Sequence, residues 1–196
     1  MNRKKIKKAG RLFVVSGPSG AGKSSLIEDA LKKLDGFSKS ISVTTRPKRV
    51  KLIDHSRYRF LTKDEFETMI EQDKLLEWAE YSGYLYGTPK EFVLENLKTG
   101  ENVILEIEVK GAMQVKEKLK DAFFIFITTT DMEELQRRLL KRGTESLDDI
   151  KDRIKIAAQE IKYQKYYNCI IVNNNYNEAL QNLIVVLDEN KGGSKN

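Results

Sequence analysis

The sequence has few of the residues on which several protein classes depend. It contains one cysteine, one histidine, one tryptophan and three prolines among 196 residues. The single cysteine, Cys169, excludes a disulfide within the chain, and its place in the apolar run CIIV predicts a buried structural thiol. The N-terminal stretch MNRKKIKKAG is followed only by the short apolar run LFVV, and no run approaches a membrane span. We therefore expect no secretory signal and a cytoplasmic location.

The overall composition predicts a single soluble domain. Hydrophobic residues make up 40% of the chain and charged residues 33%, and there are no repeats or low-complexity linkers. We expect a basic tail over 1–10, one domain over 11–190 and a flexible C-terminal tail over 191–196. The net charge of +6 suits either nucleic acid or a site for phosphates. A solvated tail is the preferred interpretation of NRKKIKK, which makes nucleic acid an unlikely partner.

Strand and helix signals alternate along the chain. Apolar runs predict strands over 11–16, 102–108, 123–128 and 169–173. Helical spacing predicts a helix after the first strand and others over 89–99, 131–142, 147–163 and 176–189. Capping-box spacing pairs Thr62 with Glu65, Thr88 with Glu91, and Thr130 with Glu133. This order predicts an α/β fold with a parallel sheet covered on both faces and ligands at the carboxyl ends of the strands.

The stretch SGPSGAGKSS at 16–25 fits the phosphate-binding pattern GxxxxGK[ST]. Its position between a predicted strand and a predicted helix makes a chance match improbable. We expect Lys23 to contact the β and γ phosphates of a nucleoside triphosphate and Ser24 to bind magnesium. The residues expected to cradle the phosphates are Gly17, Ser19, Gly20, Ala21, Gly22, Lys23, Ser24 and Ser25.

A second phosphate site is predicted in the middle of the chain. The stretch SVTTRPKRVKLIDHSRYRF at 42–60 is rich in arginine and lysine. Arg46, Arg49 and Tyr58 form a donor set suited to a phosphate, because guanidinium groups match phosphate oxygens bidentately. The alternative interpretation is an ordinary solvated basic face. An anionic acceptor needs no general base, which agrees with the placement of the only histidine, His55, in a polar loop.

Glu77 is the candidate for reading a base. It lies among apolar residues in LLEWAEYSGYLYGT at 75–88, together with Tyr86 and Thr88. A carboxylate offers two adjacent acceptors, which complement the N1–H and 2-amino group of guanine, whereas adenine has an unprotonated N1. Guanine is therefore the predicted base. We expect Trp78 to lie in the core of this region.

Taken together, these motifs resemble those of the guanylate kinases, which transfer the γ-phosphoryl group of ATP to GMP. The resemblance covers roughly residues 11 to 188 and includes, in order, GPSGAGKSS, TTR, YRF, EWAEYSG, YGT, RLLKRGTES and IVN. It implies a P-loop NTPase fold with a five-stranded parallel core. It also implies a lobe for the nucleoside monophosphate at about 43–88 and a lid at about 136–160.

The resemblance also assigns roles to individual residues. The GMP phosphate would be held by Arg46, Arg49, Tyr58 and Tyr86, and the guanine by Ser42, Glu77, Thr88 and Glu108. Glu106 would lie near the magnesium ion and Lys23. The catalytic residues would be Lys23, Arg46, Arg138, Arg142 and Arg153, of which the three lid arginines, Arg138, Arg142 and Arg153, would neutralise charge on the transferred phosphoryl group. For the lid arginines, ordinary surface charge is the alternative, because Arg138 and Arg142 have the spacing of exposed helix pairs.

Some positions depart from the family pattern. Lys51, Leu52 and His55 replace two glycines and a glutamate, and Glu108 and Lys110 replace an aspartate and a glutamine. These changes leave two alternatives open beside a guanylate kinase. One is a kinase of the same architecture acting on another phosphate-bearing acceptor. The other is a non-catalytic binding module, which the intact Lys23 and Ser24 argue against. The oligomeric state stays undetermined.

Overall fold

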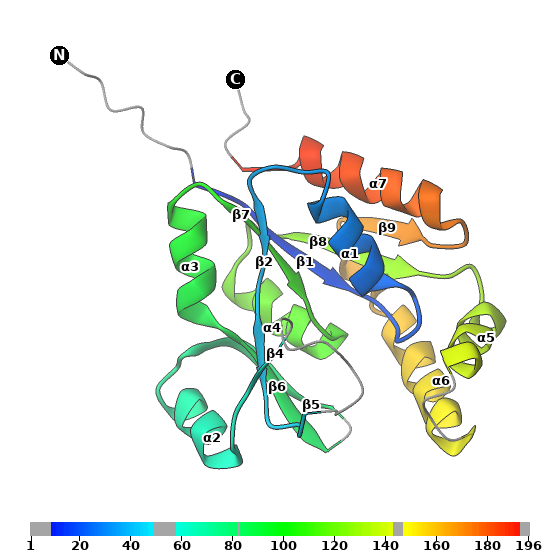
Figure 1. The fold of residues 1–196 in the computed structure, drawn as a ribbon, viewed down its shortest axis with the longest axis horizontal. Coiled ribbons are helices and arrows are strands. Elements are labelled where there is room, and N and C mark those ends of the chain that lie inside the picture. The colour runs from blue at the N-terminus through cyan, green and yellow to red at the C-terminus, as the bar shows by residue number, and fades with distance from the viewer. Residues whose placement is uncertain (1–8, 49–57, 82, 143–146, 193–196) are drawn as a thin grey trace.

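The computed structural model describes residues 9–48, 58–81, 83–142 and 147–192 (Figure 1). The strands are β1 Leu12–Ser16, β2 Phe37–Lys39, β3 Ser42–Thr44, β4 Tyr58–Phe60, β5 Leu75–Tyr81, β6 Tyr84–Pro89, β7 Asn102–Glu106, β8 Phe123–Thr128 and β9 Cys169–Val172. The helices are α1 Lys23–Leu31, α2 Lys63–Glu71, α3 Lys90–Lys98, α4 Val109–Lys118, α5 Met132–Arg142, α6 Leu147–Ile161 and α7 Tyr176–Glu189, with a 3₁₀ turn at Gln164–Tyr166.

A five-stranded parallel sheet forms the centre of the molecule. Its strand order is β2-β7-β1-β8-β9, and every neighbouring pair is parallel. Successive residues of β1 serve opposite faces: Phe13 and Val15 pack toward α1 and α7, whereas Leu12 and Val14 pack toward α3 and α4 (Figure 1). Each fully buried side chain of this size stabilises the fold by about 1.5–3 kcal/mol. The predicted parallel sheet and its four named strands are confirmed, and β2 is the fifth strand.

A second, mixed sheet lies beside the first and has the order β4-β3-β6-β5. Strands β3 and β4 are parallel, whereas β6 runs antiparallel to β3 and to β5. Helix α2 packs Phe66 against Val43 and Leu75 of this sheet. The expectation that Trp78 lies in the core is wrong. Strand alternation turns Trp78 away from the face that buries Glu77, and it is 38% exposed.

The four predicted helix ranges are confirmed to within two residues, but only one of the three capping boxes forms. At α2 the Thr62 hydroxyl accepts from the Glu65 amide, and the Glu65 carboxylate accepts from the Thr62 amide. The Thr88 prediction is wrong because the N-cap of α3 is Pro89, whereas Thr88 lies in β6 and its hydroxyl donates to Glu77. The Thr130 prediction is wrong because Asp131, one residue later, accepts from the Glu134 amide at the start of α5. In both cases the cap position is one residue later than the spacing predicts.

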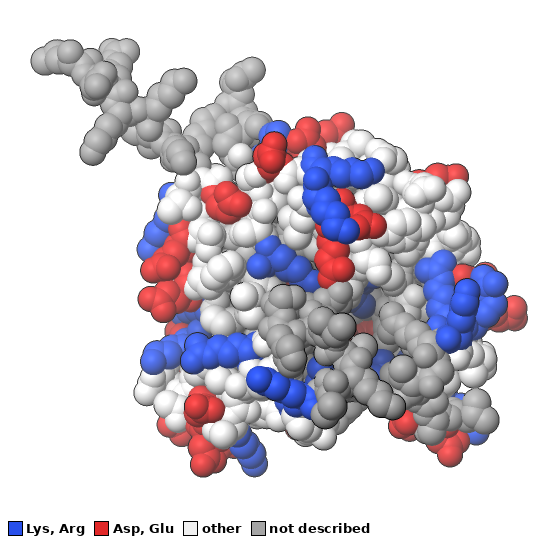
Figure 2. Space-filling view, in the orientation of Figure 1, with Lys and Arg blue, Asp and Glu red and all other residues white. Residues whose placement is uncertain are grey.

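Three further expectations concern the surface. Cys169 is only partly buried, at the edge strand β9, rather than fully buried as predicted. No helix within the described ranges is long and apolar enough to cross a membrane. On the face drawn in Figure 2, basic and acidic side chains are interspersed, so the net positive charge is not concentrated there.

Candidate functional site

The predicted phosphate loop connects β1 to α1 at the carboxyl end of the central sheet. No side chain caps α1, and no acidic residue lies in its first turn. The first amide groups of the helix are therefore available to an anion, which the positive end of the helix dipole also favours. A cavity of about 180 Å³ opens here. Its wall includes six residues of the loop and helix start, namely Ser19, Gly20, Gly22, Lys23, Ser24 and Ser25.

The loop is held in place from the end of β9. Gly22 has a φ of 87°, a conformation that side chains disfavour, and a Cβ there would run into the side-chain amide of Asn173. Asn173 donates from Nδ2 to the carbonyl oxygen of Ala21 at 2.7 Å. Its own carbonyl oxygen accepts from Arg138 Nη2 at 2.6 Å, and Arg138 Nε donates to Glu134. Arg138 therefore lies behind the loop rather than in the cavity wall.

Charged side chains surround the start of α1. Lys23 Nζ donates to the carbonyl oxygens of Gly17 and, at 3.0 Å, Pro18. The Ser24 hydroxyl donates to Glu106 Oε1 at 2.5 Å, and Lys39 Nζ lies 2.6 Å from Glu106 Oε2. Burial by itself would raise the pKa of Glu106, but the Lys39 ammonium and the Ser24 hydroxyl bring that pKa below its ordinary value. Glu106 is thus an ionised carboxylate beside the loop.

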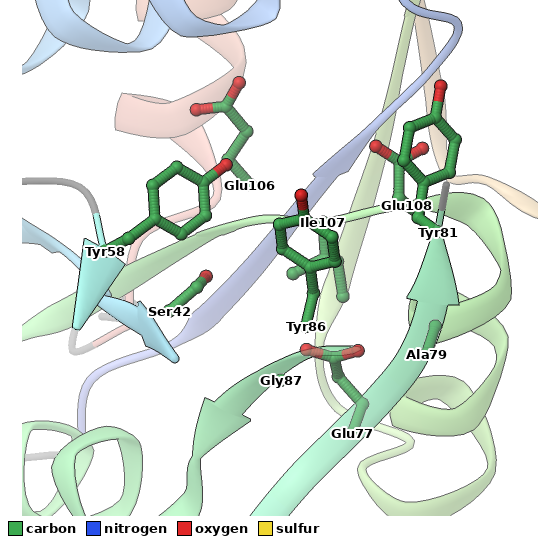
Figure 3. Close-up of a pocket in the computed structure, with 10 residues that line it drawn as sticks. All are labelled: Ser42, Tyr58, Glu77, Ala79, Tyr81, Tyr86, Gly87, Glu106, Ile107 and Glu108. Carbon is green, nitrogen blue, oxygen red and sulfur yellow. The ribbon is translucent and has the colours of Figure 1, made fainter. Parts of the chain in front are cut away.

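A second cavity, of about 140 Å³, adjoins the first (Figure 3). Its wall combines residues of the second sheet with residues that follow β7, namely Ser42, Tyr58, Glu77, Ala79, Tyr81, Tyr86, Gly87, Glu106, Ile107 and Glu108. Five of these residues also line the loop cavity: Tyr58, Tyr81, Glu106, Ile107 and Glu108. The two cavities therefore share one wall. In Figure 3, Glu77 lies at one end of this group and Glu106 and Glu108 at the other.

Glu77 is a buried carboxylate held in a fixed position. It is 4% exposed, and the Thr88 hydroxyl donates to its Oε1 at 2.6 Å. Burial raises the pKa of Glu77 to about 7. Gly111 of α4 lies against the other oxygen, and a Cβ at Gly111 would overlap Oε2. Thr88 is not among the residues that line the cavity, and its hydroxyl contacts the lining residue Glu77.

The predicted phosphate contacts of the second cavity group around Tyr58. The Arg46 guanidinium lies 5.7 Å from the centre of the Tyr58 ring, and the Tyr86 ring meets it edge-on at 6.0 Å. Burial, followed by the Glu106 charge, raises the pKa of Tyr58 to about 12, so its hydroxyl stays a donor. Arg46 Nε is buried and has no hydrogen-bond partner among the residues that the structure describes. An unpaired buried donor is a favourable place for an anionic ligand.

Helix α6 contributes two groups at the shared wall. Arg153 Nη1 donates to the Ser19 hydroxyl at 2.7 Å and so reaches the phosphate loop. Glu160 hydrogen-bonds the carboxylate of Glu108, and burial together with that neighbour raises the pKa of Glu160 to about 8. The Glu160 side chain is therefore largely protonated at neutral pH. Glu108, predicted to contact guanine, therefore also contacts α6.

The structure places most of the predicted residues in or beside the walls of the two cavities. Arg49 and the side chain of Arg142 lie outside the described residues, as do Lys51, Leu52 and His55. Arg46 and Thr88 contact the lining residues Tyr58 and Glu77 but, like Gly17, Ala21 and Arg138, are not among the residues that line either cavity. The sequence analysis missed Lys39 and Gly111, which contact Glu106 and Glu77 respectively. Neither belongs to a motif, because both act by their position on neighbouring elements.

Comparisons with known proteins identify the family of the chain. The sequence model of the family described as guanylate kinase matches residues 9–190. The chain belongs to the guanylate kinase family. The guanylate kinase of Caldanaerobacter subterraneus subsp. tengcongensis is 45% identical to it, over 93% of this chain and 88% of that protein. The guanylate kinase of Clostridium perfringens strain SM101 is 46% identical, over 95% of this chain and 87% of that protein.

A solved guanylate kinase supports the same conclusion for the fold. The crystal structure of guanylate kinase from Anaplasma phagocytophilum matches with a TM-score of 0.77 at 29% identity, covering 93% of this chain and 87% of that chain. The predicted P-loop NTPase fold with a five-stranded parallel sheet is therefore confirmed. The second sheet, the loop and both cavities lie within the residues that the guanylate kinase family model matches.

Proposed function

We propose that the transfer of the γ-phosphoryl group from ATP to GMP, which this protein catalyses as a member of the guanylate kinase family, takes place across the wall that its two cavities share. The phosphate-loop cavity would hold ATP, and the cavity containing Glu77 would hold GMP. The observation that carries this assignment is the common wall, because Tyr58, Glu106 and Glu108 line both cavities. Ligands bound on the two sides would bring the γ-phosphate of the donor and the phosphate of the acceptor together.

In the donor cavity, the amide groups at the start of α1 would bind the β and γ phosphates. Lys23 would exchange its contacts with the loop carbonyls for phosphate oxygens. Arg153 reaches the loop through Ser19 and would neutralise charge on the transferred phosphoryl group. Arg138 contacts Asn173, which braces the loop, so its contribution would be to the position of the loop.

Magnesium would join ATP in this cavity. Ser24 Oγ offers an oxygen ligand, and the ionised Glu106 lies directly behind it. Within the described ranges, no group of three or more His, Cys, Asp or Glu side chains could hold a metal by itself. This donor set suits magnesium, which binds one or two protein oxygens and completes its coordination with phosphates and water. When bound, the ion would neutralise charge on the β and γ phosphates.

In the acceptor cavity, Glu77 would accept hydrogen bonds from N1–H and the 2-amino group of guanine, with Thr88 fixing its orientation. Arg46, Tyr58 and Tyr86 would bind the GMP phosphate, which would satisfy the unpaired Arg46 Nε. An anionic oxygen of GMP then attacks the γ-phosphorus of ATP. The bond from that phosphorus to the bridging oxygen breaks, and ADP leaves. The attacking oxygen carries no proton, so no general base is required.

The test is an ADP-release assay with ATP, magnesium and a panel of monophosphates that includes GMP and AMP. We expect GMP to be preferred over AMP by more than tenfold in kcat/KM. Glu77→Gln should reduce that ratio, because the amide presents a donor toward a guanine donor, and a mismatched buried pair costs about 1–3 kcal/mol. Comparable use of AMP by the wild type would contradict the acceptor assignment. Binding of both nucleotides without turnover would indicate a binding module instead.

A further inference from the structure

Lys39 forms an ion pair beside the phosphate loop that none of the sequence motifs includes. It is the last residue of the edge strand β2 and pairs with Ile104 in the register of β2 and β7. Glu106 ends β7 two residues later, so both side chains reach the carboxyl end of the sheet. Their side chains are 19% and 17% exposed, and Lys39 Nζ lies 2.6 Å from Glu106 Oε2. This pair is much better shielded from water than an ordinary surface ion pair.

Glu106 accepts hydrogen bonds from two different elements at once. Its Oε1 accepts from the Ser24 hydroxyl on α1, and its Oε2 accepts from Lys39 on β2. A serine hydroxyl has one proton and two lone pairs. Because the proton points to Glu106, the lone pairs of Ser24 Oγ point away from the carboxylate. The orientation of Ser24 therefore depends on the position that Lys39 gives to Glu106.

Lys39 does not itself face the ligand cavities. Glu106 lines both of them, whereas Lys39 belongs to neither wall. The loop lysine, Lys23, is engaged with the carbonyl oxygens of Gly17 and Pro18. The position of Lys39 therefore favours an action through Glu106 over a direct contact with a phosphate.

We propose that Lys39 is a positioning residue for the magnesium ion that accompanies ATP. It holds Glu106 where the carboxylate accepts a hydrogen bond from the Ser24 hydroxyl, and this hydrogen bond orients the Ser24 oxygen toward the metal. The inference rests on the proposed function, which assigns magnesium to Ser24. Partners behind a metal ligand orient that ligand, and their loss costs about 10- to 100-fold in metal affinity.

Calorimetric binding of adenylyl imidodiphosphate, with magnesium or with a chelator, tests this role without turnover. In Lys39→Met we expect the gain in affinity due to magnesium to fall by about 10- to 100-fold. Binding in chelator should change little. Lys39→Arg, which keeps the charge and a donor, should retain most of the gain. Lys32→Met removes an exposed ion pair with Asp29 outside both cavities and should match the wild type.

Each other outcome identifies what has failed. An unchanged gain in affinity due to magnesium in Lys39→Met would overturn the proposal. A larger gain would also overturn it, because it would show that Lys39 repels the ion. Equal weakening with and without magnesium would reduce Lys39 to a structural role. A wild-type protein that binds the analogue no better with magnesium would refute the assignment of magnesium to Ser24, and this failure is visible before any variant is compared.

Discussion

Because Gly111 has no side chain, the Glu77 carboxylate can lie against it. A methyl group there would overlap Oε2, so Gly111→Ala should displace the proposed guanine reader although the new residue favours a helix. We expect kcat/KM for GMP to fall by an amount equivalent to about 1–3 kcal/mol, with a smaller change for AMP. Steady-state kinetics with both nucleotides measure this.

A double-mutant cycle separates this effect from general damage to α4. In a Glu77→Ala background the carboxylate is absent, so adding Gly111→Ala should cost little further GMP efficiency. Equal losses in the two backgrounds would show that Gly111 does not act through Glu77.

The ionisation of Glu77 gives a second prediction at this scale. Its pKa of about 7 means that the side chain is largely protonated below neutral pH, when it can no longer offer two acceptors. GMP affinity should therefore rise with pH up to about 7 and level off above it. Titrations of GMP binding between pH 5.5 and 8.5 measure this dependence. The affinity should change by at most about tenfold per pH unit.

The matched control is Glu77→Gln, which cannot ionise. Its GMP affinity should be weaker and keep only the pH dependence that arises from the GMP phosphate and from Glu160. Parallel pH curves for the wild type and this variant would show that Glu77 does not titrate in the relevant range.

Side-chain roles were predicted unevenly, for physical reasons. Glu77 could be identified because a carboxylate among apolar residues must have a partner. That partner is Thr88, and the Thr88 capping box failed because α3 has its N-cap one residue later, at Pro89, a shift that sequence spacing does not reveal. Lys39 and Gly111 were missed because their contacts, with Glu106 and Glu77, join separate elements.

Among the elements, those with strong periodicity or fixed spacing were predicted. Strands β1 and β8 are continuous apolar runs, and the phosphate loop between β1 and α1 follows a defined pattern. Strand β2 was not located because three residues carry no periodic signal. Helix α4 was also not located, since it begins three residues after β7 without a capping side chain to mark the boundary.

Helix α6 provides the prediction at the scale of elements. Its Arg153 donates to Ser19 of the phosphate loop, so Arg153→Met should remove both a loop contact and a charge near the transferred phosphoryl group. We expect kcat to fall by about 10²- to 10³-fold, as for other lost transition-state donors. Lys151→Met is the control on the same helix, because Lys151 pairs with Asp148 on the exposed surface. Similar turnover in the two variants would show that Arg153 is an ordinary surface charge without a role in catalysis.

At the scale of the whole molecule, the cavity proposed to hold GMP is built from two sheets. Ser42, Tyr58 and Tyr86 belong to the second sheet, whereas Glu106 ends a strand of the central sheet. The fold class and the parallel sheet could be predicted because they depend on patterns along the chain. The common wall could not, because it depends on how one sheet sits against the other. We propose that the region at about 43–88 acts as the acceptor lobe and the region at about 136–160 as the lid.

A site divided in this way should close when both nucleotides bind. The phosphates of ATP and GMP are polyanions that would bridge cations on different parts of the fold, such as Lys23 on the loop, Arg46 after β3 and Arg153 on α6. We expect the radius of gyration from small-angle scattering to decrease when GMP and adenylyl imidodiphosphate are present together, and less with either alone. Lys23→Ala, which weakens only the donor side, should keep the response to GMP alone and reduce the additional change caused by the ATP analogue. Identical radii under all conditions would mean that the lobes form one rigid body, in which case the shared wall must bring the two phosphates together without closure.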